Sequence, residues 1–377
     1  MNIKDFIAGN FIQRYEYRSF EPKPINHIWT WDEPEINMRL EKANKLLGEL
    51  NAFTYIVPDI DLFIAMHILK EATKSSKIEG TKTDIDEAVL PVEEISPEKR
   101  DDWLEVHNYI KAINFAVNEL ENLPISTRLI KETHRILIDG SRGENKTPGE
   151  FRKSQNWIGG NSLSDAVFVP PHFDSLPHLL TDLDFFINNT ELKVPHLIKI
   201  ALIHYQFETI HPFLDGNGRI GRLLITLYLV SNKIIGKPSL YLSDYFEKHR
   251  ALYYDSLTMV REKNDIAGWI NFFLQAVEHT AENSIITFRK IFDLKNKYDI
   301  FISNAGYRAG DIRILINYLY KSPVIDTITL AGLLKKDKRT VRRIIDILEE
   351  AGILKEVTGY RRNRNYVLND YLLLFLK

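Results

Sequence analysis

Apolar residues recur at helical spacing through most of this chain, and the pattern breaks in only a few places. The segment Asp59–Ile78 shows it well, because its leucine, isoleucine and alanine positions fall on one stripe of an amphipathic helix. The same periodicity predicts helices at about residues 84–90, 97–120, 126–138, 174–188, 196–210, 217–232, 241–261 and 266–303. The protein is therefore expected to be mainly α-helical.

Two stretches before residue 300 depart from this pattern. Residues 1–35 contain many aromatic residues and three prolines with little periodicity, which predicts an extended arm packed on the rest of the protein. Residues 147–171 are short on helical signals, lean toward β structure, and end in Pro170-Pro171. Glycines bound this second stretch, so it predicts a small hairpin inside a helical domain.

The character of the chain changes again after Asn304-Ala305-Gly306. A short apolar helix, a brief strand and a pair of helices with a tight polar connection follow in that order. Two strand-like segments then flank the basic stretch 358–364. The predicted elements are helices at 312–320, 329–335 and 339–351, and strands at 323–327, 353–357 and 365–368. This order is typical of a winged helix-turn-helix.

Composition narrows the class of protein. With 377 residues, 44% of them hydrophobic and 27% charged, the chain is expected to be a globular protein of two or three domains. It has no cysteine, which excludes disulfides and thiolate metal sites. It lacks a signal core at its start and any apolar run of about 18 residues, so we expect a cytoplasmic protein without a membrane span.

Charge is unevenly distributed. The whole chain carries a net charge of −2, which gives no global preference for nucleic acid or membranes. Residues 307–377, however, hold 14 Lys and Arg against 8 Asp and Glu. The C-terminal unit is thus basic and the remainder acidic.

The strongest chemical signal is the stretch His211–Arg222, which reads HPFLDGNGRIGR and lies between two apolar helical segments. Gly216 and Gly218 permit a backbone turn that other residues resist. The loop leads directly into a helix, whose free N–H groups and positive dipole end favour an anion. One carboxylate, one imidazole and two guanidinium groups crowd around it, which indicates phosphate chemistry.

Three other interpretations of this stretch fit the sequence less well. A glycine turn with solvated charges explains fewer of its features, and no Lys-Ser/Thr follows the second glycine as in a G-x-x-x-x-G-K-[ST] nucleotide loop. His204, Glu208 and His211 lie at i, i+4 and i+7 and could ligate metal, but no second Glu-x-x-His occurs on another helix. His204 is therefore expected to be a core or supporting residue.

The stretch resembles the signature of the Fic-domain family, H-x-F-x-[D/E]-G-N-G-R-x-x-R, at every position. The resemblance covers roughly residues 60–290. It implies a Fic-type helical bundle in which residues 147–171 form a β-hairpin flap and Tyr253 or Tyr254 borders adenine. The implied activity is that of an ATP-dependent protein adenylyltransferase, which transfers AMP to Ser, Thr or Tyr hydroxyls.

The resemblance also implies roles for individual residues. His211 would be the general base, since imidazole titrates near neutrality. Asp215 would bind Mg²⁺, and Arg219 and Arg222 would clamp the β- and γ-phosphates. The implied ATP-binding set is Glu79, His211, Gly216, Asn217, Gly218, Arg219, Ile220, Gly221, Arg222 and Tyr253. The glycines and Asn217 would supply backbone and amide donors to the α- and β-phosphates.

A second motif, Ser75-Ser76-Lys77-Ile78-Glu79-Gly80, matches the family's inhibitory pattern [S/T]-x-x-x-E-[G/N]. Ser75 and Glu79 lie one turn apart on one helix face. The implied role of Glu79 is to pair with Arg222 in a bidentate fork and to deny that arginine to the γ-phosphate. The resting protein is then expected to be largely self-inhibited, within a single chain.

The expected organisation has four parts: residues 1–58 as arm and helix, 59–95 as the inhibitory helix region, 96–304 as the Fic core, and 305–377 as the winged helix. Basic residues suited to DNA phosphates are Lys338, Arg339, Arg342, Arg343, Arg361, Arg362 and Arg364. Docking or dimerisation would suit the winged helix equally, and apolar surface in 266–303 fits either a homodimer or core burial. Two alternative functions also stay open: a DNA-binding regulator with a nucleotide-sensing Fic core, and an enzyme that removes AMP with the help of Glu79.

Overall fold

The structure, a computed structural model, describes residues 1–56, 59–140, 146–361 and 364–376. It is mainly helical, as predicted, and most helix bounds lie within a few residues of those expected from periodicity. The helices are α1 (Pro34–Ile56), α2 (Asp61–Ile78), α3 (Ile85–Ala88), α4 (Arg100–Glu119), α5 (Thr127–Leu137), α6 (Leu176–Asn188), α7 (His196–Ile210), α8 (Asn217–Ser231), α9 (Ser243–Lys248), α10 (Arg250–Lys263), α11 (Ile266–Ser303), α12 (Ala309–Lys321), α13 (Thr327–Leu334), α14 (Lys338–Glu350) and α15 (Asn369–Leu372). The strands are β1 (Gly9–Gln13), β2 (Arg18–Pro22), β3 (Val324–Asp326), β4 (Leu354–Glu356) and β5 (Asn365–Leu368).

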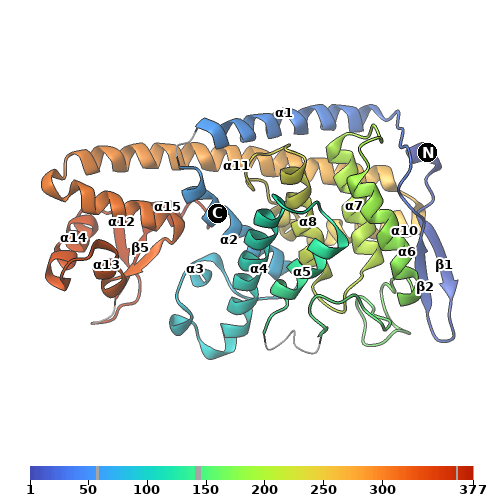
Figure 1. Ribbon diagram of the computed structural model, residues 1–377, viewed down its shortest axis with the longest axis horizontal. Coiled ribbons are helices and arrows are strands. Elements are labelled where there is room, and N and C mark those ends of the chain that lie inside the picture. Colours follow the sequence, from blue (N-terminus) through green and yellow to red (C-terminus); the bar gives the residue numbers. More distant parts are fainter. Residues whose placement is uncertain (57–58, 141–145, 362–363, 377) are drawn as a thin grey trace.

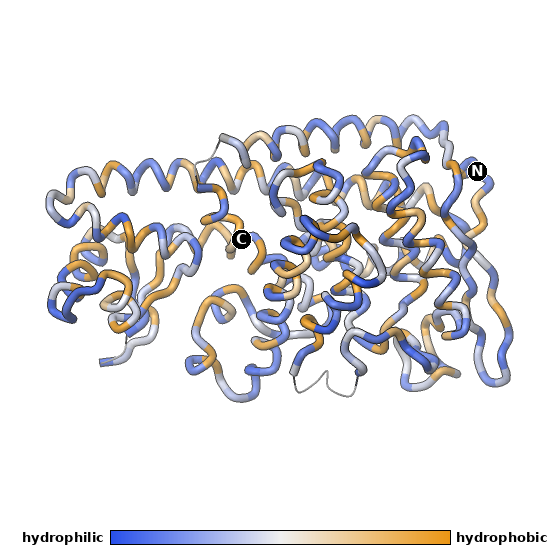
Figure 2. Tube along the Cα trace, viewed as in Figure 1, coloured by the Kyte–Doolittle hydropathy of each residue, from blue (hydrophilic) through white to orange (hydrophobic). Residues whose placement is uncertain are grey.

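Helix α11 is the longest element and links the two ends of the molecule (Figure 1). Its 38 residues span about 57 Å at 1.5 Å per residue. Helix α1 packs along it, and the shorter helices of residues 61–263 lie beneath the pair. Polar and apolar residues alternate along α1 and α11 in Figure 2, as expected for helices that cover a core on one side.

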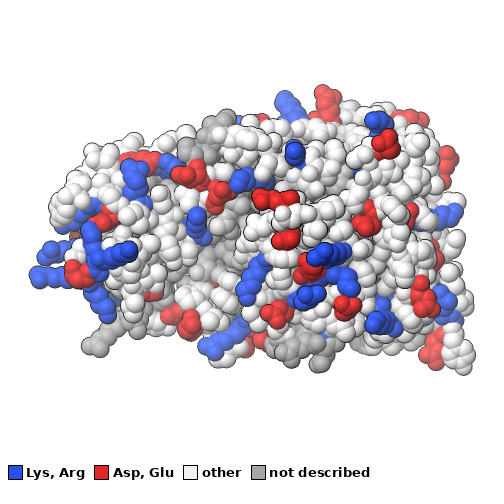
Figure 3. All heavy atoms as spheres, viewed as in Figure 1, with Lys and Arg blue, Asp and Glu red and all other residues white. Residues whose placement is uncertain are grey.

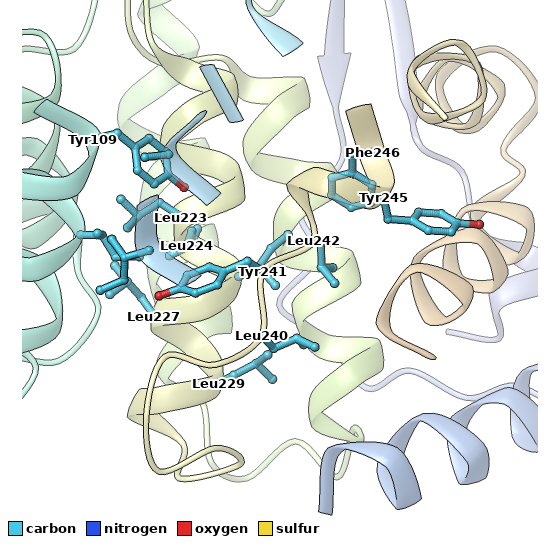
Figure 4. Packing of buried hydrophobic residues seen from close by; sticks show 14 of the residues in the cluster. Tyr109, Leu223, Leu224, Leu227, Leu229, Leu240, Tyr241, Leu242, Tyr245 and Phe246 are labelled. Atoms are coloured by element: carbon cyan, nitrogen blue, oxygen red, sulfur yellow. The ribbon is translucent and has the colours of Figure 1, made fainter. Parts of the chain in front are cut away.

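Helices α7 and α8 form the centre of this bundle, and both are buried on nearly all sides. Leu223, Leu224 and Leu227 of α8 gather beside Tyr109 of α4 and Tyr241 (Figure 4). Because such a helix is packed on every face, its amino-terminal end is held in one place. That end carries the glycine-rich stretch His211–Arg222.

The N-terminal arm differs from the expectation of a merely extended segment. It forms an antiparallel hairpin in which β1 pairs with β2 from Gly9↔Pro22 to Gln13↔Arg18. The hairpin was missed because its turn, residues 14–17, contains no glycine or asparagine to mark it. Strand β2 also meets the predicted flap, since the Phe20 N–H donates to the Val169 oxygen at 2.9 Å.

The predicted flap hairpin at 147–171 is smaller than expected. Within it the structure has one isolated antiparallel bridge, Ile158↔Phe168, and no strand. Gly159 and Gly160 both adopt positive φ, and the carboxylate of Asp165 accepts main-chain N–H bonds, so the excursion between the bridge residues is a compact loop. The segment predicted as one helix at 241–261 is likewise divided, into α9 and α10 at His249.

Residues 309–368 form the predicted set of three helices and a small sheet. The sheet is antiparallel with strand order β3-β5-β4. Lys335 in the left-handed conformation ends α13, and the Asp337 carboxylate caps α14 after a three-residue connection. Of the basic residues expected on the β4–β5 connection, Arg362 lies outside the described residues. Across the described ranges we find no helix of the length and apolar character required to cross a membrane.

Candidate active site

The loop between α7 and α8 is shaped by two residues with positive φ. His211 ends α7 at φ 49°, and Gly216 precedes α8 at φ 75°. The positive φ of Gly216 favours glycine, and a Cβ there would also overlap the end of the Ile138 side chain. Asn217 then closes the loop, because its side chain accepts from the Phe213 N–H and donates to the Phe213 oxygen, both at 2.8 Å. The Asn217 side chain thus holds the loop, and its main-chain N–H lies in the first turn of α8.

His211 is oriented as a proton acceptor. Its Nδ1 lies 3.3 Å from the Glu208 carbonyl oxygen, and because a carbonyl only accepts, Nδ1 carries the proton. Nε2 therefore keeps its lone pair. Burial lowers the pKa of His211 to about 4, so the imidazole is neutral at neutral pH. The side chain is 16% exposed, which leaves an approach to it.

Arg222 lies at the centre of the predicted inhibitory contact. Its Nη2 donates to Glu79 Oε1 at 2.6 Å and to the Ser75 main-chain oxygen at 2.9 Å, while Nε donates to Ser75 Oγ at 2.9 Å. The predicted bidentate fork is wrong in detail, because only one carboxylate oxygen binds, and Ser75 accepts the bond from Nε and a second bond from Nη2. Burial raises the pKa of Glu79, but the charge and hydrogen bond of Arg222 lower it by more, so the net pKa lies below its ordinary value.

The Glu79 carboxylate also covers the beginning of α8. A Cβ placed on Gly218 would overlap Glu79 Oε1, so the carboxylate lies directly on the first turn of that helix. Among the residues that the structure describes, no side chain caps α8 at its N-cap, Gly216. Glu79 thus lies against the uncapped N–H groups and positive dipole end that would attract a phosphate.

Asp215 and Arg219 form the outer side of the site. Arg219 is buried and pairs through Nη1 with Glu105 Oε2 at 3.0 Å, and its Nη2 lies 3.8 Å from Asp215 Oδ1. Asp215 Oδ1 also accepts from the Gly216 N–H at 2.6 Å, and the side chain is 48% exposed. In the described parts of the chain no three His, Asp or Glu side chains are grouped to hold a metal. A single exposed carboxylate suits Mg²⁺, which takes most of its ligands from phosphates and water.

Of the two tyrosines expected near adenine, Tyr253 does not border an open site. It is 1% exposed, and its hydroxyl lies 2.9 Å from His204 Nε2. His204 Nδ1 donates to the Gly221 oxygen, so both ring nitrogens are used and His204 is a core residue, as expected. The neighbouring Tyr254 is 38% exposed and is the one of the two tyrosines that could meet a ligand. Ile220 and Gly221 are buried inside α8, so their side-chain positions serve packing.

Three residues that sequence reasoning did not single out hold the loop from the flap and α5. Arg152 donates from Nε to the His211 oxygen at 2.9 Å and from Nη2 to the Pro171 oxygen at 2.6 Å. Asn156 donates to the Phe213 oxygen at 2.8 Å. His134 stacks on the Phe213 ring at 3.7 Å, accepts from the Gly149 N–H and lies 3.0 Å from the Asp215 oxygen. Through these bonds the flap is part of the loop's support.

Two segments of the chain match known protein families. Residues 37–118 match the family described as Fic/DOC family N-terminal, and residues 124–229 match the Fic/DOC family. Over 189 residues the chain is 31% identical to "Protein adenylyltransferase Fic" of Aedes aegypti, in an alignment covering 48% of this chain and 34% of that protein. The chain thus spans about a third of the length of the curated relatives it matches.

Two solved structures share the fold. One is a Fic family protein from Desulfovibrio desulfuricans G20, with a TM-score of 0.54 and 20% identity, covering 90% of this chain and 97% of that chain. The other is a Fic domain containing signaling protein from Bacteroides thetaiotaomicron VPI-5482, with a TM-score of 0.52 and 19% identity, covering 68% of this chain and 97% of that chain. These likenesses establish the fold of the helical bundle.

Proposed function

We propose that this chain, which contains a Fic/DOC family N-terminal domain at residues 37–118 and a Fic/DOC family domain at residues 124–229, is a self-inhibited protein adenylyltransferase. It would transfer AMP from ATP to Ser, Thr or Tyr hydroxyls of target proteins and of itself. The observation that carries the proposal is the Glu79 carboxylate, which is bound to Arg222 and lies over the first turn of α8. The relatives named "Protein adenylyltransferase Fic" support the same activity.

The loop residues supply the chemistry of transfer. The target hydroxyl gives its proton to Nε2 of His211 as its oxygen attacks the α-phosphorus of ATP. The bond from that phosphorus to the β-phosphate oxygen breaks, and pyrophosphate leaves. The main-chain N–H groups of Asn217 and Gly218 lie where they can donate to phosphate oxygens, and the helix dipole favours the added charge.

Asp215 is the residue proposed to hold Mg²⁺, because its carboxylate is half exposed beside the anion site. When bound, the ion would neutralise phosphate charge and orient the leaving group. Arg219 orients Asp215 from its buried pair with Glu105. Arg222 would hold the γ-phosphate once Glu79 leaves it.

Glu79 would inhibit in two ways. It neutralises Arg222, which removes the partner of the γ-phosphate, and it occupies part of the space in front of α8. A phosphate brought to the same helix end would also meet its negative charge. ATP would then bind in an unproductive position or not at all, and the resting chain would transfer AMP slowly.

The test is incubation of the full chain with α-labelled ATP and Mg²⁺. Glu79→Gly should incorporate much more label than wild type, and His211→Ala in the same background should incorporate none while still binding ATP. Equal labelling of wild type and Glu79→Gly would refute self-inhibition. If the labelled chain is freed of ATP and metal and then loses its label when Mg²⁺ alone is restored, that result would instead support removal of AMP with the help of Glu79.

A further inference from the structure

The described basic residues of the C-terminal unit gather on one end of the molecule. Residues 335–343 hold six Lys and Arg and a single acidic residue, Asp337. The Asp337 carboxylate is engaged by the Arg339 and Thr340 N–H groups as the cap of α14. Figure 3 shows the positive side chains clustered at the end where α13 and α14 lie (compare Figure 1).

Helix α14 presents these charges to solvent along one face. Its other face is apolar and buried through Val341, Ile344, Ile345 and Leu348. Five cations are exposed at or just before its amino-terminal half: Lys335, Lys336, Lys338, Arg339 and Arg343. Lys336 pairs with Asp311, and the half-buried Arg342 pairs with Asp346. The other four exposed cations form no salt bridge with a residue that the structure describes. Arg339 and Arg343 are four residues apart and so lie side by side.

We propose that this face of α14 binds duplex DNA. The arrangement is that of a helix-turn-helix, in which the amino-terminal half of the second helix enters the major groove. Unpaired arginines and lysines there would contact phosphates and base edges without first breaking an ion pair. The wing contributes less, because Tyr360 of the β4–β5 connection donates to Glu94 and so lies against an acidic turn of the catalytic unit.

Binding is tested by fluorescence anisotropy of a labelled duplex of about 30 base pairs with the full chain. If the four cations each neutralise one phosphate, the slope of log affinity against log salt is about −3.6, and affinity falls roughly 100-fold between 50 and 200 mM salt. Arg339→Ala/Arg343→Ala should flatten that slope by about 2, because each lost contact removes about 0.9. The control Lys290→Ala removes an exposed cation of α11, on another part of the surface, and should change nothing.

The proposal is overturned by no binding at 50 mM salt, by binding that does not depend on salt, or by a double variant that binds like wild type. Tighter binding of an RNA duplex of the same sequence would also overturn it. Both substitutions are on the solvent face, so unchanged thermal unfolding is expected and confirms that the variant is folded.

A separate observation concerns how the same unit contacts the inhibitory helix. The amino-terminal third of α2 lies in the core of the C-terminal unit. The Phe63 ring packs against Tyr320 and Tyr371 at 4.8 and 6.3 Å, and the His67 ring against Phe375 at 5.1 Å. Phe63, Tyr320, Tyr371 and Phe375 are all at most 1% exposed. One continuous helix therefore joins this contact to Ser75 and Glu79.

Glu71 lies at the midpoint between Phe63 and Glu79, eight residues from each, and is fixed in the core. Its carboxylate accepts from the Tyr109 hydroxyl at 2.9 Å and from the Ser243 hydroxyl at 2.5 Å. Phe63 and Glu79 are about 24 Å apart along the helix axis. A cavity of about 50 Å³ lined by His67 and Phe375 leaves room at the contact with the C-terminal unit.

We infer, on the basis of the proposed function, that the C-terminal unit holds α2 in the inhibitory position. Helix α2 acts as a rigid lever that pivots at Glu71. When its amino-terminal third is displaced, its carboxyl-terminal end tilts and Glu79 moves away from Arg222. A ligand that binds the C-terminal unit and displaces this part of α2 therefore controls AMP transfer without contacting the catalytic loop.

Phe375→Ala in the full chain tests this inference. Self-labelling should rise at least fivefold over wild type, and hydrogen exchange of residues 72–80 should become faster. Tyr307→Ala, which removes an 85% exposed aromatic of the same region, is the control and should do neither. Phe375→Leu keeps an apolar side chain and should show a smaller effect in both measurements.

The outcomes separate this inference from the proposed function. If Glu79→Gly labels strongly and Phe375→Ala matches wild type in labelling and exchange, the lever is refuted. If Glu79→Gly does not label at all, the proposed function fails, and hydrogen exchange alone then decides whether α2 is held by the C-terminal unit.

Discussion

Replacement of Glu79 by glutamine should raise the rate of self-labelling roughly 5- to 10-fold. Glutamine keeps the size of the side chain but removes the charge that pairs with Arg222 at 2.6 Å. A hydrogen bond to a charged partner contributes about 1.5–3 kcal/mol, and the 35% exposure of Glu79 places this one in the lower half of that range, at about 2 kcal/mol. The amide oxygen still accepts a bond worth about 0.5–1 kcal/mol, so about 1–1.5 kcal/mol is lost. Since about 1.4 kcal/mol is a factor of ten in an equilibrium, the open site becomes 5- to 10-fold more populated.

The assay is the initial rate of AMP incorporation from α-labelled ATP by the purified full chain. Glu49→Gln is the matched control, because it neutralises a glutamate of similar exposure that pairs with an arginine, Arg289, between α1 and α11. It should label at the wild-type rate. A glutamine variant as slow as wild type, beside an active Glu79→Gly, would show that charge pairing with Arg222 is not what inhibits. A rise in the control as large as in the glutamine variant would refute the reasoning as well.

Three further predictions follow from packing and charge. Gly221→Ala should lower the free energy of unfolding by about 1–3 kcal/mol in chemical denaturation, because the added Cβ would overlap the buried Glu208 carboxylate. Gly332→Ala is the control: the space around Gly332 is open, so this variant should be neutral or stabilising. Burial depresses the pKa of four histidines: His67 and His204 to about 3, and His134 and His211 to about 4. Between pH 6.5 and 4.5 the unfolded chain binds roughly four more protons at these histidines than the folded chain does. The folded chain binds about one more proton at Glu208, whose pKa burial raises to about 7, so stability falls by about 4 kcal/mol per pH unit on acidification. A thermal midpoint that stays constant over this range would contradict that prediction. Arg152→Lys in the Glu79→Gly background should lower the rate of labelling roughly tenfold with little change in the unfolding transition. The reason is that an ammonium group cannot donate to both main-chain carbonyl oxygens that the guanidinium binds. An unchanged rate would show that the flap does not position the loop.

Much of the fold was accessible from the sequence because helical periodicity is a local property. Helices α7, α8 and α11 begin and end within a residue of their predicted bounds, because the apolar residues they bury recur without a break along the sequence. The N-terminal hairpin was not accessible, because strand pairing depends on distant residues and residues 14–17 give no turn signal. The flap was overestimated for the converse reason, as β-leaning composition does not require paired strands.

The residues of the site likewise differ in whether the sequence predicts their contacts. The contact of Ser75 and Glu79 with Arg222 was expected because a spaced motif records it. The supporting roles of Arg152 and Asn156 were invisible, because their partners are main-chain carbonyl oxygens that every residue possesses. The sequence could not show which of tyrosines 253 and 254 is buried. That depends on which face of α10 packs against His204, and this is known only from the structure.

The absence of a Cβ at Gly218 limits which substitutions this protein can accept during evolution. Because the inhibitory carboxylate and the nucleotide would share the space beside Gly218, almost any substitution there disturbs both restraint and activity at once. Mutations in α2, by contrast, can weaken restraint alone and leave the catalytic loop intact. Regulation is therefore expected to diverge among descendants of this chain faster than chemistry, through changes at Ser75, Glu79 and the residues that anchor their helix.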